Sequence, residues 1–119
     1  MRIHIFLNDK VPNNMLDTEV LTYLFKRCKE KPKLNHYHIN NLNIKEQATI
    51  NVFVDSFNLY HISNAKYNIF IPNHHYFLKN WIDSLGYFDL ILCKTNYCYQ
   101  LYDIEYFFQL FLMHISRMA

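Results

Sequence analysis

Polar side chains follow four apolar stretches of the chain: Asn8-Asp9, Asp55, Asn73 and Lys94-Thr95. If these stretches are strands of a parallel sheet, their carboxyl ends meet at one edge. Open α/β sheets bind ligands at that edge, because strands end and helix amino termini begin there. Carboxylate, amide, ammonium and hydroxyl groups gathered there could hold a polar ligand. Asp, Asn and Thr are also common turn and cap residues, so each position has an ordinary structural explanation as well.

The stretch 67–95 predicts a strand, a helix and a second strand with no hairpin between them. Residues 67–71 and 89–94 are apolar, and Gly86 stands where a helix C-cap glycine is favoured. The residues between the two strands recur at helical spacing: Phe77, Leu78, Trp81, Ile82 and Leu85. Such a βαβ crossover implies parallel pairing of the two strands.

The rest of the chain predicts further elements of the same kind. Strands are expected over residues 2–7, 34–39 and 48–55, because each is rich in β-branched and aromatic residues. A helix of about four turns, capped by Asn13 or Asn14 and ended by Pro32, presents one apolar face. That face comprises Met15, Leu16, Val20, Leu21, Leu24, Phe25 and Cys28.

Three segments have weaker or less usual patterns. Residues 44–47 favour a helical turn, and residues 56–65 favour an irregular or briefly helical segment. A final helix is expected over residues 96–117, apolar on more than one side. The resulting order predicts an α/β fold: a single Rossmann-like domain, residues 1–119, with a mostly parallel five-stranded sheet flanked by helices.

Bulk composition excludes several classes of function. The chain is 51% hydrophobic and 18% charged, which is typical of a folded domain, and its formal charge of +2 does not indicate a nucleic-acid partner. No stretch approaches the ~18 apolar residues of a membrane span. The three cysteines form no CxxC pair and no secretory segment is evident, so we expect reduced thiols and a cytoplasmic location.

The sequence indicates no metal and no other cofactor. His36 and His38 could share one face of a strand, but no third ligand stands nearby. His74 and His75 are consecutive and would diverge on a helix. The chain contains a single glycine, which excludes the usual glycine-rich phosphate loops.

A response-regulator receiver domain is one alternative interpretation of the polar edge. Asp55 would be the phosphorylated residue after the third strand, and Lys94 would be the lysine after the fifth. However, Asn8-Asp9 offers one carboxylate where an acidic pair is needed for a divalent ion. Pro72-Asn73 stands where a small hydroxyl residue is expected, and no proline follows Lys94.

Two linked motifs carry a resemblance to a known family. The chain has Asn68-Ile69-Phe70-Ile71-Pro72-Asn73-His74-His75-Tyr76-Phe77, then Trp81, then Asp89-Leu90-Ile91-Leu92-Cys93-Lys94-Thr95. Over roughly residues 48–100 it resembles the amino-terminal half of GT-B glycosyltransferases of the group-1-like type. These often have N-x-x-(I/V)-P-N-x-E-(W/F/Y), a tryptophan in the next helix, and D-x-(V/I)-L-x-K-T. His75 departs from the family pattern, which has an acidic residue there.

The resemblance implies an acceptor-side domain that lacks the donor-binding half. In that family the carboxyl-terminal half mainly holds the nucleotide sugar, and this chain stops where the interdomain connection would begin. The residues implied to face a sugar acceptor are Asp55, Asn73, His75, Tyr76, Lys94 and Thr95, with Trp81 nearby. No catalytic residue is identified.

The apolar last helix favours two further interpretations. Residues 103–117 could bind a second glycosyltransferase domain or a second copy of the chain, or could simply complete the core. A non-catalytic interaction module that uses this helix is the main alternative to a glycosyltransferase domain.

Overall fold

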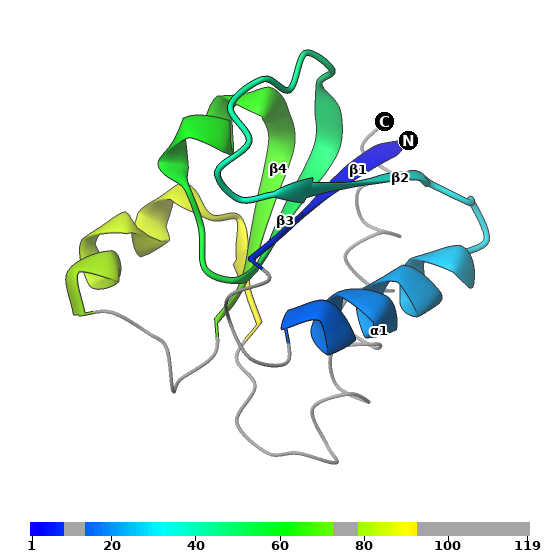
Figure 1. Cartoon of the computed structure of the whole chain (residues 1–119), viewed down its shortest axis with the longest axis horizontal. Coiled ribbons are helices and arrows are strands. Elements are labelled where there is room, and N and C mark those ends of the chain that lie inside the picture. The colour runs from blue at the N-terminus through cyan, green and yellow to red at the C-terminus, as the bar shows by residue number, and fades with distance from the viewer. Residues whose placement is uncertain (9–13, 73–78, 93–119) are drawn as a thin grey trace.

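The computed structural model describes residues 1–8, 14–72 and 79–92, and these form an α/β domain with an all-parallel five-stranded sheet (Figure 1). The strand order is β2-β1-β3-β4-β5. The strands are β1 (Arg2–Leu7), β2 (Lys33–His38), β3 (Ala48–Asp55), β4 (Ala65–Pro72) and β5 (Leu90–Ile91). The helices are α1 (Asn14–Lys26) and the 3-10 helices η1 (Leu59–Asn64) and η2 (Lys79–Tyr87). The predicted Rossmann-like fold is therefore confirmed.

The sheet is covered on both faces, which explains why its strands are nearly continuous apolar runs. On one face, Ile3 and Ile5 of β1 belong to a core that includes Leu21 and Phe25 of α1. On the other face, Phe6 belongs to an aromatic core that η1, η2 and the loops complete. This second core also contains Ile39, Phe53 and Phe70, with Tyr37, Ile44, Phe57, Ile62, Trp81, Leu85 and Phe88 packed against it.

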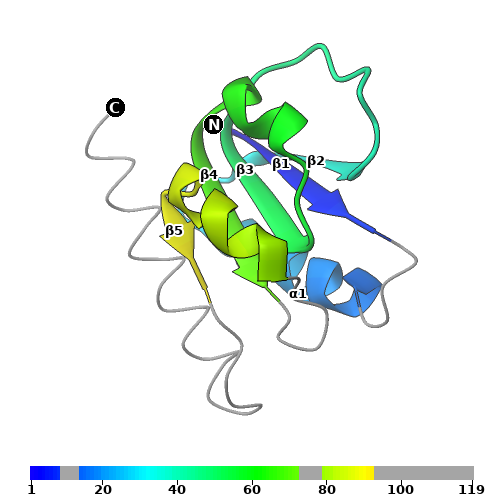
Figure 2. The ribbon, with the colours of Figure 1, turned by 90° about the vertical axis from the view of Figure 1, so that its left-hand side faces the viewer.

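The path of the chain explains which connections cover which face. From β1 the chain moves outward through α1 to β2, then returns past β1 to β3 and continues outward to β4 and β5. Parallel crossovers are almost always right-handed, so a reversal of direction moves the connections to the opposite face. Figure 2 shows η1 and η2 on the side of the sheet away from α1.

Two local predictions were wrong. Residues 44–47 contain no helix, and Ile44 packs into the aromatic core instead. Four residues form too few hydrogen bonds to offset the entropy lost when a helix begins. Gly86 is not a left-handed C-cap, because η2 continues through it to Tyr87 and no described glycine has a positive φ. The element closes instead with a hydrogen bond from Phe88 N to Leu85 O, at 3.2 Å.

One row of side chains across the aromatic face is polar. The register places His4 beside Asn35 on one side and beside Asn51 on the other, and Asn51 beside Asn68. Asn68 then exchanges hydrogen bonds with Asp89, through Asp89 N to Asn68 O and Asn68 N to Asp89 Oδ2. The polar row therefore runs from β2 to the residue that precedes β5.

The asparagines of this row attach η1 to the sheet. Asn51 Nδ2 donates to the carbonyl of His61 at 2.8 Å and to Asn68 Oδ1 at 3.0 Å. Asn68 Nδ2 donates to the carbonyl of Ile62 at 3.0 Å. Because these groups are buried, each of the bonds is costly to lose.

Two buried histidines lie in the same layer. His61 stacks on Phe6 with ring centroids 4.3 Å apart, and its Nε2 donates to the carbonyl of Ile39. Neither ring nitrogen of His4, nor Nδ1 of His61, has a hydrogen-bond partner among the described residues. Burial lowers the pKa of both side chains, and the positive charge of Arg2 lowers the pKa of His4 further. Both rings are therefore neutral in the folded protein near pH 7.

We expect Asn51→Leu to destabilise the domain by about 2–4 kcal/mol, because the carbonyl of His61 and Oδ1 of Asn68 both lose their donor inside the core. Urea unfolding followed by circular dichroism measures this change. The exposed Ser63 of η1 provides the control, since Ser63→Ala should change stability by no more than about 0.5 kcal/mol. Equal effects of the two substitutions would contradict this role of the asparagine pair.

Stability should fall as the pH drops below the ordinary histidine value of 6.5, because His4, His36 and His61 have lowered pKa values in the folded protein and bind protons more readily in the unfolded chain. Their contribution to stability is fully present above pH 6.5 and is lost as the pH falls. Urea midpoints measured from about pH 8 to about pH 5 test it. His4→Phe should flatten the profile, whereas Ser63→Ala, which removes no ionisable group, should leave it unchanged. A wild-type midpoint that stays constant over this range would refute the expectation.

Candidate functional site

The carboxyl ends of the central strands meet at one edge of the sheet. Asp55, the last residue of β3, is in register with Pro72, the last residue of β4. Pro72 has no N–H to donate, so the ladder between these strands cannot continue beyond this pair. The strands that lead into Asn73 and into the turn after Asp55 therefore end side by side, as the sequence predicts.

This edge contains the point at which the chain reverses its direction across the sheet. The order β2-β1-β3-β4-β5 places the reversal between β1 and β3, which are hydrogen-bonded neighbours. In open α/β sheets, ligands bind outside the carboxyl ends of the strands at such a reversal. Asp55 ends β3 at this position, and Ser56 follows it directly.

Asp55 has a strained backbone and a fully buried side chain. Its φ is 68°, the only positive φ of a non-glycine residue in the part of the chain that the structure describes. Its exposed fraction is 0%. Aspartate tolerates this left-handed conformation better than most residues, because its short side chain can form local hydrogen bonds. A left-handed residue at the end of a central strand turns the chain sharply away from the sheet.

Ser56 brings a second unusual feature to the same corner. Its Oγ is buried and has no hydrogen-bond partner among the residues that the structure describes. An unpaired buried hydroxyl costs about 1–3 kcal/mol. Backbone strain and unpaired polar groups are features that proteins retain mainly at functional positions. We therefore take the Asp55–Ser56 corner, defined by these two residues, as the candidate site.

The other residues predicted for this site lie outside the described residues: Asn73, His75, Tyr76, Lys94 and Thr95. The segment 103–117, predicted to bind a partner, lies outside them too. Trp81 is described, and it packs into the aromatic core, with ring centroids 5.0 Å from Phe57 and 6.0 Å from Phe70. Its position is explained by packing.

The described histidines and cysteine have roles within the protein itself. His36 and His38 share the α1 face of β2, as predicted, but His36 Nε2 is bonded to Thr22 Oγ1, and His38 Nδ1 accepts from Asn40 N. Burial raises the pKa of the Cys28 thiol, which disfavours its reactive thiolate form. Over residues 1–8, 14–72 and 79–92, no three His, Cys, Asp or Glu side chains come together as a metal site would require.

A surface hollow between α1 and β2 was not predicted. Seven residues line it: Leu7, Thr18, Glu19, Thr22, Tyr23, Lys26 and His36. Thr18, Thr22 and Lys26 recur every fourth residue, which places them on one stripe of α1. This spacing was the available signal, but the same helix carries a stronger apolar pattern, and the position of β2 beside the stripe depends on the tertiary fold.

None of the helices in the described part of the chain has the length and apolar character that crossing a bilayer requires. Comparison with known proteins gives no family assignment: no family model, no curated protein and no solved structure matches the chain.

Proposed function

We propose that this chain is the acceptor-side domain of a GT-B-type glycosyltransferase. It would take part in sugar transfer from a nucleotide sugar only when a second, donor-binding domain or chain completes it. The observation that carries the proposal is the Asp55–Ser56 corner, because backbone strain and an unpaired hydroxyl coincide at the reversal point of the sheet.

The arrangement of the two resembling motifs supports the proposal. The first motif includes β4 and the second includes β5, and these strands pair in parallel through Ile69 with Leu90 and Phe70 with Ile91. Pro72 in turn stands beside Asp55. Segments that resemble the acceptor-side motifs therefore leave the sheet at the same edge as the strained corner.

The chemistry of the corner suits a sugar hydroxyl. A serine hydroxyl can donate one hydrogen bond and accept two, so Ser56 has unused capacity for a ligand that both donates and accepts. Transfer requires donor and acceptor to be held together in reactive geometry. We therefore expect this chain to bind the acceptor without catalysing transfer by itself.

The isolated protein should bind a subset of sugars on a glycan array, without a nucleotide sugar and without turnover. Ser56→Ala should weaken this binding by about 5- to 30-fold, the equivalent of one neutral hydrogen bond of ~1–2 kcal/mol. Asn73→Ala should weaken it as well. Titration calorimetry with the best-bound sugar measures both effects.

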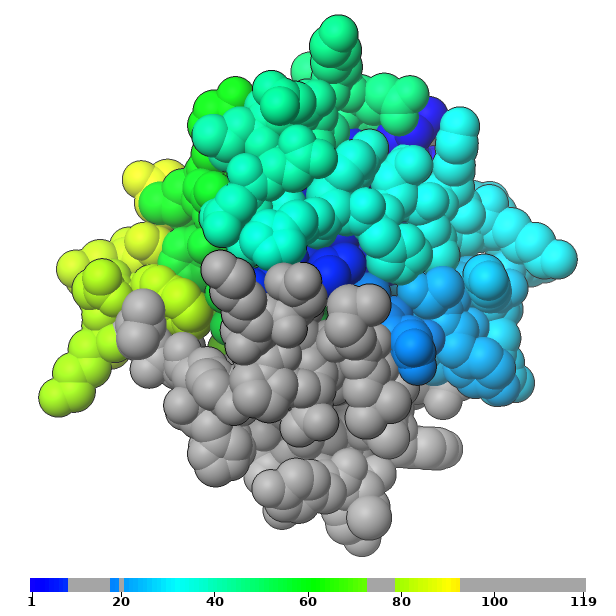
Figure 3. All heavy atoms as spheres, in the orientation of Figure 1, coloured from blue at the N-terminus to red at the C-terminus, as the bar shows by residue number. Residues whose placement is uncertain are grey.

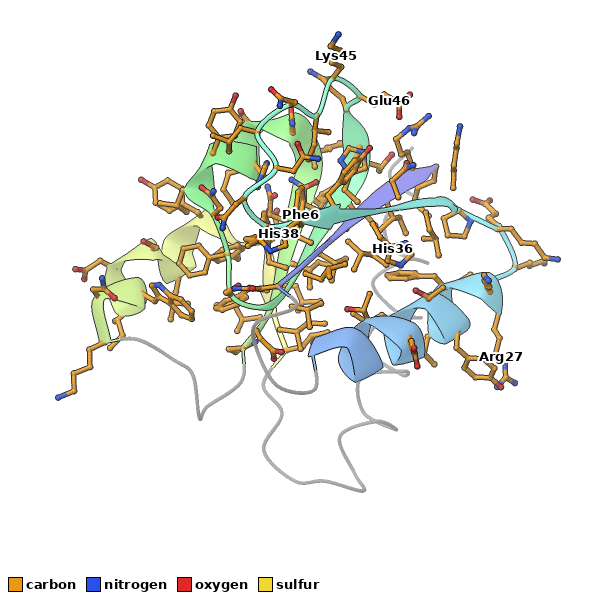
Figure 4. The ribbon with its side chains drawn as sticks, viewed as in Figure 1. Phe6, Arg27, His36, His38, Lys45 and Glu46 are labelled. Atoms are coloured by element: carbon orange, nitrogen blue, oxygen red, sulfur yellow. The ribbon has the colours of Figure 1, made fainter. Side chains whose placement is uncertain are left out.

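The exposed Lys45 lies in the loop before β3, at the opposite end of the sheet (Figure 4), so Lys45→Ala is the matched control. Ser56→Ala also removes an unpaired hydroxyl, so the variant should be at least as stable as the wild type. Weaker binding could then not be attributed to unfolding. Absence of any glycan binding, or unchanged binding by both Ser56→Ala and Asn73→Ala, would overturn the proposal.

A second candidate, a receiver-like phosphoacceptor domain, is favoured by one specific observation. The strand order β2-β1-β3-β4-β5 is one of the two common doubly wound orders and is shared by receiver domains, and Asp55 ends the central strand β3. This support rests on fold-level analogy. The Asp55 side chain is fully buried, as the Ser56 Oγ is, so a phosphodonor and a sugar alike reach this corner only when the chain opens there.

Acetyl phosphate with magnesium tests this second candidate. A carboxylate oxygen of Asp55 would attack phosphorus while the bond to the acetyl oxygen breaks and acetate leaves. Intact-mass analysis should then show one added phosphoryl group, absent in Asp55→Asn and present in Asp89→Asn, whose aspartate is exposed. Unlabelled wild-type protein would eliminate the receiver-like function.

A further inference from the structure

The hollow between α1 and β2 has a volume of about 360 Å³, and although charged, hydroxyl and aromatic residues line it, most of its lining surface is apolar. In the space-filling view, α1 and the segment around β2 lie side by side on one face of the protein (Figure 3). Figure 4 shows His36 between these two elements. Of the residues at the strand ends, only Leu7 lines the hollow, so it is distinct from the Asp55–Ser56 corner.

A chain of hydrogen bonds fixes the orientation of His36. Thr22 Oγ1 donates to the carbonyl of Thr18 at 2.8 Å, and the same oxygen lies 2.8 Å from His36 Nε2. A hydroxyl has one proton to donate, so Thr22 must accept from His36, and the Nε2 atom carries the hydrogen. In the neutral ring, Nδ1 then has a free lone pair for a ligand.

The hollow is positively charged at one end. Lys26 and His36 both line the hollow. Burial, and then the positive charge of Lys26, lower the pKa of His36. Among the described residues, Lys26 forms no salt bridge, and the one ion pair there joins Arg2 and Glu46. Lys26 is therefore available to an anion.

The opposite end carries a carboxylate. Glu19 precedes Lys26 by two helical turns, a separation of ~10 Å along the axis of α1. A carboxylate repels phosphate but accepts hydrogen bonds from sugar hydroxyls. The hollow therefore distinguishes between the two ends of a ligand.

Tyr23 provides an aromatic wall. Its ring is 58% exposed, and it is held by Arg27, whose guanidinium lies 5.3 Å from the ring centroid and donates to the phenol oxygen at 3.0 Å. Arg27 thus orients the ring and adds a second positive charge next to Lys26 in the sequence. An aromatic face beside hydrogen-bonding groups is well suited to the C–H face of a sugar ring.

We propose that this hollow binds a small sugar phosphate, with the phosphate at Lys26 and His36 and the sugar hydroxyls at Glu19, against the ring of Tyr23. The phosphate accepts from the ammonium of Lys26, and in its monoanionic form its remaining hydroxyl donates to Nδ1 of His36. Such a site is additional to the proposed acceptor edge, and its existence does not depend on sugar transfer.

The test uses three probes, with the side-chain NMR signals of His36 and Tyr23 as the readout: glucose 6-phosphate, inorganic phosphate and glucose. Glucose 6-phosphate should bind most tightly, inorganic phosphate less tightly, and glucose least. Lys26→Met should weaken binding of both phosphates by at least ~10-fold, the usual value of one charge-assisted hydrogen bond. Lys45→Met, which removes an exposed lysine far from the hollow, should have no effect.

Glu19→Gln separates the two ends of the site. It should leave inorganic phosphate binding unchanged or stronger, because a negative charge is removed, while glucose 6-phosphate binding weakens. Glu19 and Lys26 are both exposed on α1, so their substitution should not prevent folding. Equal binding of glucose and glucose 6-phosphate, unchanged phosphate binding by Lys26→Met, or no shift of His36 with either phosphate would overturn the proposal.

Discussion

The fold depends on a buried pair of asparagines whose amide groups bond within the protein, although Oδ1 of Asn51 has no partner among the described residues. Asn51 and Asn68 stand side by side in the middle of the sheet, where water cannot reach them. Their side chains bond to each other and to the carbonyls of His61 and Ile62. These directional bonds to the carbonyls of His61 and Ile62 hold η1 in one position on the aromatic face, which apolar packing specifies less narrowly because it is non-directional.

The strands were predictable because their burial on both faces leaves a clear trace in the sequence. Residues 48–55 form β3 with the predicted limits, and β1 also begins and ends as expected. The 3-10 form of η2 was not predictable, because an apolar spacing of three to four residues suits both helix types. Gly86 was misleading because its φ is not positive, so the structure does not use the conformational freedom that makes glycine a common helix C-cap.

The sequence predicts where the candidate site lies, but not its backbone strain or its unpaired hydroxyl. A polar residue at the end of an apolar strand already places Asp55 at the ligand edge of a parallel sheet. Its left-handed backbone and the unpaired hydroxyl of Ser56 depend on contacts that only the folded chain provides. The hollow beside α1 was harder still to predict from the sequence. Lys26 and His36 line it together only because the helix packs on the edge strand β2.

The strand order has a consequence for synthesis and folding. Of the described strands β1 is made first, yet it is interior to the sheet: Ile3 pairs with Leu34 on one side and with Ile50 on the other. No described strand can pair with its successor through a hairpin, because every pairing is parallel. The nascent chain therefore carries an apolar segment without partners until β2 and β3 have emerged from the ribosome. Non-local pairings of this kind slow folding and expose the chain to aggregation. During synthesis, β1 therefore depends on protection until both of its neighbouring strands are available.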